Sequence, residues 1–193
     1  MNFENFKEIV NNTRCVRRFK HGINIPNQDL VELIDLARTI SSSKNMQPLR
    51  YITISDEEIK EKVYKPLQWA AHLSQWNQSE DEKPSAYILM INDTNIDGFA
   101  MIDCGIALQT IMLGATAKGY DGCVLASIDK KEYSKLFNLD SHLEPMIIIA
   151  LGVKDENVEV VDVKDGNTNY YRKDDETHCV PKRKLSEVLL GEY

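Results

Sequence analysis

The stretch that decides the fold is AMIDCGIALQTIMLGATAKG, residues 100–119 of the 193-residue chain. On a helical wheel its apolar side chains point in almost every direction, which is typical of a helix in the middle of a protein. Twenty helical residues would span about 30 Å, the width of a small domain. The uncharged run 104–117 is too short for a membrane span and therefore favours a buried core helix.

Three glycines mark this stretch. Gly105 and Gly114 each cost about 1 kcal/mol of helix stability relative to alanine. Their presence suggests that another backbone, or a flat ligand, comes close to the helix. Gly119 is a natural C-terminal stop.

Composition limits the class of protein. A formal net charge of −7 argues against a general nucleic-acid binder. We expect one domain over residues 1–193, and the lack of a basic, apolar leader predicts a cytoplasmic protein without a membrane anchor. The four cysteines lack CxxC spacing. Reduced thiols and no bound metal are expected, with metal or disulfide pairing left open.

Hydrophobic periodicity outlines the helices on both sides of the central stretch. A short amphipathic helix is expected near the N-terminus, and another after Pro26 with Asn27 as its cap. A helix followed by an exposed loop is expected within residues 66–84. Two capping-box spacings predict helices at 56–64, with Ser55 and Glu58, and at 130–137, with Asp129 and Glu132.

Apolar and β-branched runs predict the strands. These runs are RYITIS at 50–55, SAYILMIN at 85–92, GCVLASI at 122–128 and PMIIIALGV at 145–153. A hairpin is expected around Asp165–Gly166. Because strands and helices interleave through long crossovers, the predicted fold is α+β, an α/β sandwich. Its mixed central sheet would hold four to five strands flanked by helices.

Three polar segments could together bind a phosphate, which needs cations and directional donors. They are 14–18, 41–47 and 181–184. The alternative is a solvated basic surface beside an ordinary loop, since charge runs usually are solvated faces. The candidates are Arg14, Arg17, Lys182 and Arg183 for charge, and Ser42, Ser43 and Asn45 for hydrogen bonds.

Catalytic patterns of the GxSxG, Walker A, GxGxxG and HExxH types are absent from the sequence. Its histidines, at 21, 72, 142 and 178, are isolated, and each is expected on the surface rather than at a metal. Cys15 lies between arginines, where a lowered thiol pKa is one interpretation and a small packing residue beside a ligand the favoured one. Anion-binding segments without acid–base machinery suggest that a cofactor carries the reaction.

Five segments, in order, resemble the FMN-dependent nitroreductases. TRCVRRF is similar to that family's R-S-x-R-x-F segment, and SSSKNMQPLRYITI to its P-S-x-x-N-x-Q-P-W-x-F segment. DCGIALQTIMLGATAKGYDGCVLASID resembles the central helix and the strand after it. PMIIIALG and VPKRKLSEVL resemble the last core strand and the basic C-terminal segment. The resemblance covers nearly the whole chain and implies a nitroreductase-like, intertwined homodimer that buries the apolar helix.

The resemblance also implies a flavin site built from both chains. Arg17 would be the cation near flavin N1 and the C2 carbonyl, and the backbone N–H of Ala126 would point at N5, so these two are the implied catalytic residues. The serines and Asn45 would reach the FMN of the other subunit, and the basic pair would close on the phosphate. The implied FMN-binding residues are Arg14, Cys15, Arg17, Ser42, Ser43, Asn45, Leu125, Ala126, Lys182 and Arg183.

Some positions depart from the family pattern. Cys15 stands where serine is usual, which removes a good hydroxyl donor, and Leu49 replaces a common tryptophan. Neither change removes a cation, so FMN binding is still expected. The register of the basic C-terminal pair could shift by one residue.

Two functions from different classes follow. The first is an oxidoreductase that takes hydride from NADH or NADPH onto flavin N5 and passes electrons to a nitroaromatic or quinone acceptor by ping-pong kinetics. The second is a flavin-binding or redox-sensing protein without turnover, and a flavin-free structural dimer is a third reading. Trp69 and Trp76 are interpreted either as lid residues or as core aromatics at helical spacing.

Overall fold

The computed structural model describes residues 2–73 and 76–193. The helices are α1 (Phe3–Asn12), α2 (Asn27–Ala37), α3 (Glu57–Tyr64), α4 (Ala100–Ala117), α5 (Lys130–Leu136) and α6 (Leu185–Val188), with 3₁₀ turns η1 (Ser43–Asn45) and η2 (Glu80–Glu82). The strands are β1 (Leu49–Ile54), β2 (Ala86–Asp93), β3 (Asp121–Leu125), β4 (Leu143–Gly152), β5 (Val158–Asp162), β6 (Tyr171–Arg172) and β7 (His178–Lys182).

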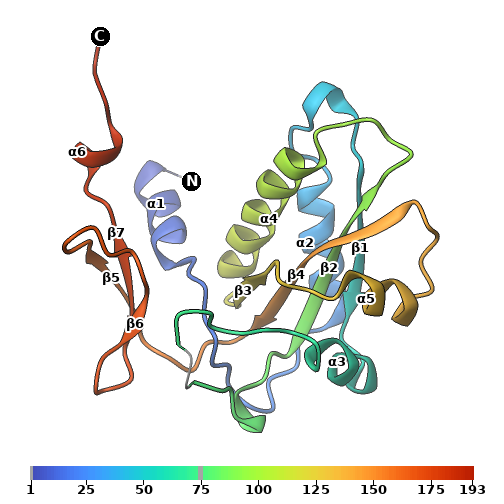
Figure 1. Cartoon of the computed structure of the whole chain (residues 1–193), viewed down its shortest axis with the longest axis horizontal. Helices are drawn as coiled ribbons and strands as arrows, with labels where there is room; N and C mark the ends of the chain where they lie inside the picture. Colours follow the sequence, from blue (N-terminus) through green and yellow to red (C-terminus); the bar gives the residue numbers. More distant parts are fainter. Residues whose placement is uncertain (1, 74–75) are drawn as a thin grey trace.

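The main sheet has four strands in the order β1-β2-β4-β3, and each neighbouring pair is antiparallel. Side chains of β2 alternate between two cores, as strand geometry requires. Ala86, Ile88 and Met90 pack with α2 and α4 on one face. Tyr87, Leu89 and Ile91 pack with α3 and α5 on the other. This three-layer arrangement confirms the predicted α/β sandwich (Figure 1).

Helix α4 is buried on one side only within this chain. Cys104, Ala107 and Ile111 are fully buried, whereas Met101 is 70% and Ile102 58% exposed. The predicted helix is therefore confirmed in position, but its other face is uncovered. Within the described residues it is also the one helix whose length and composition would permit a membrane span. Its packing against α2 and the sheet is that of a core helix.

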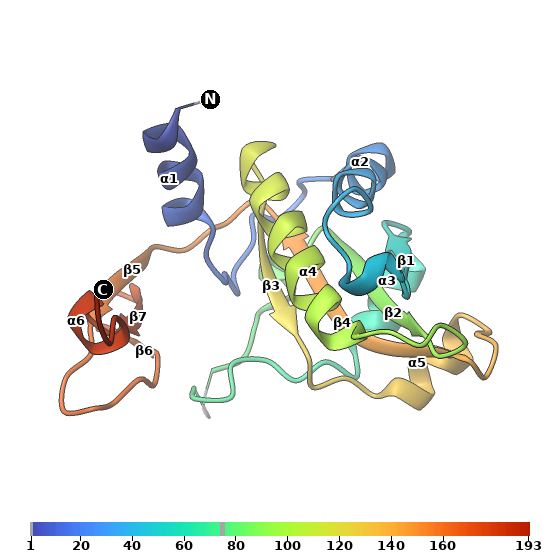
Figure 2. The same cartoon turned by 90° about the horizontal axis from the view of Figure 1, so that it is seen from above.

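A second sheet, in the order β5-β7-β6, lies in the C-terminal arm, residues 154–193. Strand β5 runs parallel to β7 and β6 antiparallel to it. In both views the arm and α1 lie beyond α4, away from the main sheet (Figures 1 and 2). No residue of α1 is buried. Both elements therefore present surface that this chain does not cover.

The hairpin predicted around Asp165–Gly166 is only partly correct. Both residues have positive φ, 51° and 73°, and the Asn167 N–H closes the turn on the Lys164 carbonyl at 2.9 Å. This is the backbone expected of an Asp-Gly turn. However, β5 and β6 do not pair, because β7 lies between them.

Two predicted helix caps are wrong by one residue. Pro26 stands at the N-cap of α2, and Asn27 is already helical. Asp56, not Ser55, caps α3 by accepting a 3.0 Å hydrogen bond from the Ile59 N–H. Aspartate and serine are equally good N-cap residues, so the spacing alone could not decide between Ser55 and Asp56. At α5 the predicted cap Asp129 is confirmed.

The helix predicted within residues 66–84 is absent from the described parts of that segment, where only η2 is helical. Ala70 has a φ of 50°, which no α-helix accommodates. Trp69 packs against Tyr64, with 6.1 Å between ring centroids. Trp76 instead lies beside two guanidinium groups, those of Arg18 and Arg172. Helical spacing therefore does not explain either tryptophan.

The chain before α2 is fixed to the end of β4 by Phe19. This side chain is fully buried, and residue 19 forms an isolated antiparallel bridge with Lys154. A Cβ at Gly152 would lie 2.5 Å from Cδ1 of Phe19. Glycine is therefore required here so that the aromatic ring can pass close to the strand.

We expect Gly152→Ala to lower the free energy of unfolding by about 1–3 kcal/mol, the usual cost of overpacking. Phe19→Leu should make room, so the double variant should lose less stability than the two single losses combined. Urea titrations of the four proteins give this coupling. Strict additivity would show that the two residues do not compete for the same space.

Candidate functional site

The cationic segment 14–18 lies alongside β3. Cys15 forms a parallel bridge with Gly122, and the Val16 N–H donates to the Gly122 carbonyl at 2.9 Å. Val16 and Phe19 are fully buried, which anchors the segment. Arg14 and Arg17 remain partly exposed. The local alternation of apolar and cationic residues thus turns the charges away from the core.

Arg17 is held by the C-terminal arm. Its Nη1 lies 3.0 Å from Nε2 of His178, and its guanidinium carbon lies 4.4 Å from the centroid of the Tyr170 ring. Gln78 donates to its carbonyl at 2.6 Å. Among the ion pairs of the described residues, none includes the Arg17 guanidinium. Its positive charge is therefore oriented but not neutralised.

The arm meets the core at a buried carboxylate. The Glu156 side chain is 1% exposed and pairs with Arg172, itself 8% exposed. It also accepts the backbone N–H groups of Arg17 and Arg18. A buried carboxylate requires this many donors to offset its desolvation. Glu156, Tyr170, Arg172 and His178, with Arg17, form the arm junction, which the sequence reading missed.

His178 is 1% exposed, so the surface position predicted for it is wrong. Burial, then the charges of Arg17 and Arg172, lower its pKa to about 4, although Glu156 opposes them. The imidazole is therefore neutral at pH 7, with Nε2 free to accept from Arg17. Its Nδ1 has no hydrogen-bond partner within the described residues.

The thiol pKa of Cys15 is lowered, which is the less favoured of its two interpretations from the sequence. The Cys123 thiol, by hydrogen bonding to it, is the main cause of a pKa of about 6, with help from the Val124 backbone and the charges of Arg17 and Lys182. Burial works in the opposite direction. Lys182 of β7 therefore lies near enough to act on the same site. Arg183 instead pairs with Glu187 at 3.9 Å on the exposed tail.

The turn after β3 adds a backbone donor. Leu125 is buried at the end of the strand and Ala126 is exposed beyond it. The Ile128 N–H donates to the Ala126 carbonyl at 3.1 Å, whereas none of the hydrogen bonds in the described part of the chain uses the Ala126 N–H. This turn can therefore donate to a ligand.

The predicted serines lie at a different place, before β1 and beside the first turns of α4. Asp103, 2% exposed, accepts the Ser42 hydroxyl at 2.5 Å and the Ser43 N–H at 2.9 Å. Asn45 is exposed, with a φ of 57°. Ser42 and Asp103 line a cavity of about 220 Å³. Asp103 is the only acid within 100–119, a signal that could have identified it from sequence.

The two groups of residues are separated along α4. The chain just before Arg14 contacts the end of α4, where the hydroxyls of Thr13 and Thr116 are 2.8 Å apart. The serines bond to Asp103 near its beginning. Thirteen residues of helix correspond to about 20 Å. One chain therefore brings together Cys15, Arg17 and Lys182 beside β3, the strand that ends at the Leu125–Ala126 turn, but it does not bring the serines and Asn45 to them. Arg14 belongs to the same segment, and its side chain has no hydrogen bond or ion pair within the described residues.

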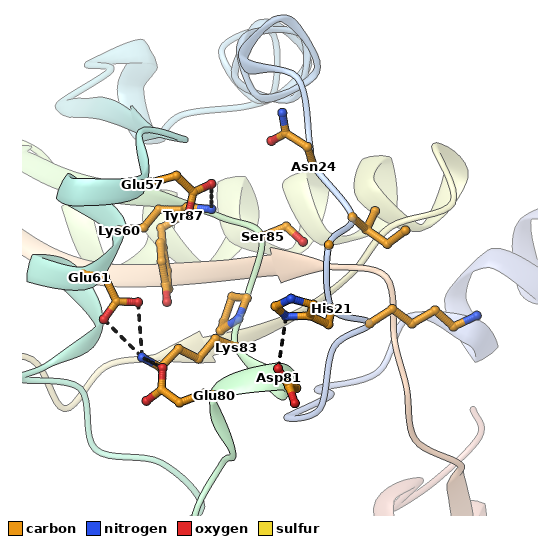
Figure 3. Close-up of a pocket in the computed structure, with 14 residues that line it drawn as sticks. His21, Asn24, Glu57, Lys60, Glu61, Glu80, Asp81, Lys83, Ser85 and Tyr87 are labelled. Carbon is orange, nitrogen blue, oxygen red and sulfur yellow. Dashed lines mark hydrogen bonds and ion pairs between the residues drawn. The ribbon is translucent and has the colours of Figure 1, made fainter.

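Another hollow, of about 330 Å³, lies between α3, η2 and the loop after Phe19 (Figure 3). Two of its three lysines are used internally, because Lys60 bonds Glu57 at 2.7 Å and Lys83 bonds Glu61 and Glu80, while Lys20 forms no ion pair within the described residues. Its lining contains none of the predicted FMN-binding residues. We therefore do not assign the anion site to it.

Comparison with known proteins identifies relatives of this arrangement. A Bacillus subtilis (strain 168) protein named as an NAD(P)H nitroreductase, YdgI, is 24% identical over 189 residues, covering 76% of this chain and 87% of that protein. A nitroreductase-type structure from Exiguobacterium sibiricum 255-15, solved in complex with FMN, is similar with a TM-score of 0.67 and 22% identity, covering 82% and 93%. An enone reductase, CLA-ER, has a TM-score of 0.68 at 20% identity, covering 85% and 95%.

The match to a family model identifies the family of this chain. The sequence model described as the nitroreductase family matches residues 10–153, which include α2, α4 and all four strands of the main sheet. The C-terminal arm lies outside the match. Since the matched region is most of the chain, this protein belongs to the nitroreductase family of oxidoreductases.

Proposed function

We propose that the protein is a homodimeric, FMN-dependent oxidoreductase that takes hydride from NADH or NADPH. Electrons then pass to an electron-poor acceptor, a nitroaromatic or a quinone, by ping-pong kinetics. The observation that carries this proposal is the separation of two polar groups along α4, with an uncovered apolar face between them. A second copy placed against that face would bring the serines of one chain to the arginines of the other.

The residues near Cys15 suit an FMN phosphate and ring. Neither Arg14 nor Arg17 takes part in an ion pair within the described residues, and Lys182 adds a third cation nearby. The charges of Arg17 and Lys182 both act on the Cys15 thiol, and two unneutralised cations near one another are unfavourable unless an anion joins them. The unused Ala126 N–H supplies a donor for flavin N5 at the same place.

When bound, FMN supplies the redox chemistry by accepting a hydride at N5 and releasing electrons to the acceptor. The chain binds and orients it. Arg17 would hold positive charge near N1 and the C2 carbonyl, where it stabilises the reduced form. Ser42, Ser43 and Asn45 would come from the other subunit. Because donor and acceptor would occupy the same ring face in turn, the nicotinamide leaves first.

His178 would keep Arg17 in this role. A neutral imidazole accepts a hydrogen bond without cancelling the guanidinium charge, whereas a carboxylate would cancel it. Tyr170 limits the guanidinium to one orientation. The arm therefore acts as a support for the catalytic cation. Four free cysteines also favour the reducing cytoplasm as its location.

We expect the purified protein to bind FMN and to oxidise NADH or NADPH steadily with menadione or a nitroaromatic. Arg17→Ala should weaken FMN at least about tenfold, the value of one charge-assisted contact, and should slow flavin reduction. Lys62→Ala, which removes an exposed cation on α3, is the control. FMN titration and anaerobic stopped-flow spectroscopy provide both readouts.

Three results would count against this proposal in different ways. A colourless protein that takes up no FMN would exclude the flavoprotein. A yellow protein without NAD(P)H turnover would instead support the flavin-binding or sensing alternative. If the Arg17 and Lys62 variants lost FMN affinity and reduction rate equally, the role of Arg17 would be refuted, but the flavoprotein proposal would stand.

Dimerisation through α4 is tested by Ile106→Glu. Ile106 and Ile23 are both 41% exposed, but Ile23 lies in the loop before α2. We expect the charge at 106 to give a monomer by sedimentation and to abolish tight FMN binding, because half of the site is lost. Ile23→Glu should change neither property. An Ile106→Glu dimer that still binds FMN would contradict the shared site.

His178 predicts a specific loss of stability in acid. Its pKa is 6.5 unfolded and about 4 folded, so its contribution is complete above pH 6.5 and disappears as the pH falls towards 4. His178→Gln should reduce this dependence of unfolding free energy on pH, measured by urea titration. His21→Gln, which changes an exposed imidazole, should leave it intact. Identical pH profiles for His178→Gln and the unmodified protein would refute the buried neutral state.

A further inference from the structure

We propose that Asp103 is a positioning residue, which through Ser42 holds the segment 42–47 in the shape that the flavin site requires. The Ser43 hydroxyl and the Asn45 amide would then be the groups that this segment presents to the FMN of the other subunit. Ser42 itself would not bind FMN directly. This inference deepens the proposed function and rests on it. It depends on the hydrogen bonds that join the segment to the start of α4.

Asp103 fastens the segment to α4 at two points. It is 2% exposed and lies in the first turn of α4, where the partial positive charge of the helix N-terminus favours an acid. One of its oxygens accepts the Ser43 N–H at 2.9 Å, and the other accepts the Ser42 hydroxyl at 2.5 Å. Within residues 2–73 and 76–193, no ion pair includes this carboxylate. The two donors from the segment are therefore what offsets its burial.

The bonding of Ser42 leaves its hydroxyl without a proton for a ligand. A serine hydroxyl has one proton to donate and two lone pairs that accept. Because an ionised carboxylate only accepts, the proton of Ser42 lies towards Asp103. The Gln47 N–H donates to the same serine oxygen at 2.9 Å. A phosphate or a flavin carbonyl accepts hydrogen bonds, so neither can bind this hydroxyl unless the bond to Asp103 breaks.

The backbone between these anchors is of a kind that needs support. Lys44, Asn45 and Gln47 have φ values of 51°, 57° and 54°, in the left-handed region that non-glycine residues seldom adopt. Such conformations persist where the surrounding structure holds them. The anchored N–H groups, those of Ser43 and Gln47, stand at the two ends of this stretch. Loss of the Asp103 carboxylate would therefore release the stretch at both ends.

Two side chains of the segment keep their donors for a ligand. Among the hydrogen bonds of the described part of the chain, none uses the Ser43 hydroxyl or the Asn45 side-chain amide. Asn45 is exposed, and Ser43 is partly exposed. Adjacent serines therefore have different tasks, because the hydroxyl of Ser42 is bonded inwards and that of Ser43 is free. The resemblance alone treats the two serines alike.

The first test measures FMN affinity by titration and unfolding free energy in urea for variants of the full chain. Ser43→Ala should weaken FMN about tenfold, the value of one charge-assisted contact, without lowering stability. Asp103→Asn and Ser42→Ala should each weaken FMN by a similar factor. The double variant should bind FMN no more weakly than Asp103→Asn alone, because both changes act through one anchor. Asp97→Asn, which changes an exposed acid just before α4, is the matched control.

Mixed dimers test whether the anchor serves the other subunit. A chain with Arg17→Ala is co-expressed with a chain with Asp103→Asn, and two different tags isolate the mixed dimer. One of its sites then receives an intact Arg17 and an intact segment 42–47, and the other receives neither. We expect one FMN per mixed dimer to bind as tightly as in the unmodified protein. The homodimers of both variants should bind FMN weakly.

Each contrary result has a separate meaning. An unmodified protein that takes up no FMN would overturn the proposed function itself. If the unmodified protein binds FMN but the mixed dimer has no tight site, only the role of Asp103 across the dimer is overturned. A Ser42→Ala loss that adds in full to that of Asp103→Asn would show that Ser42 binds FMN directly.

A destabilised variant far from the segment separates positioning from a general loss of structure. Val63 of α3 is fully buried in the core on the other face of the sheet. Val63→Ala should lower the free energy of unfolding because it leaves a cavity, and it should leave FMN affinity unchanged. If it weakened FMN as much as Asp103→Asn does, the role of Asp103 would be structural only.

Discussion

The rest of the structure depends on helix α4, of which this chain buries only one apolar side. Inward side chains of α4 close the core against α2 and the sheet, while Met101, Ile102 and Ile106 remain open to water. Burying one such side chain is worth about 1.5–3 kcal/mol, so a second surface is strongly favoured. Gly105 lies on this open side, and a Cβ there would meet nothing in its own chain. Nothing within this chain therefore requires a small residue at position 105, and glycine there would allow the backbone of a second copy to approach in the proposed dimer.

A buried carboxylate holds in place the arm that contacts Arg17. The Glu156 carboxylate is almost fully buried. The groups that donate hydrogen bonds to it come from both the arm and the segment before α2. Removing one donor would leave a desolvated carboxylate, so the arm cannot detach cheaply. Tyr170 and His178, which belong to the same arm, contact Arg17 beside this ion pair. Anchoring and orientation are thus separate tasks given to neighbouring residues.

Periodicity predicted the main sheet and α4 because each strand and the helix carry their own burial pattern. It could not predict the arm junction, because Glu156, Tyr170 and His178 become neighbours only through the pairing of β5 and β6 with β7. The resemblance could not supply it either, since the family match ends at residue 153. The helix predicted within residues 66–84 was wrong for another reason. Their tryptophans have helical spacing, but backbone with positive φ at Ala70 and contacts to Tyr64 and Arg18 decide the conformation.

Arg17 and Arg18 show a limit of prediction from sequence. Both are arginines in one cationic segment, so the sequence does not distinguish their roles. Arg18 is paired with Glu82 at 3.1 Å and Glu176 at 2.8 Å, so its charge is already used to hold the arm and η2 together. Arg17 instead faces a neutral imidazole and an aromatic ring, which orient a guanidinium without cancelling it. A guanidinium that is oriented but not neutralised can still bind an anion, which is what the proposed FMN site requires of Arg17.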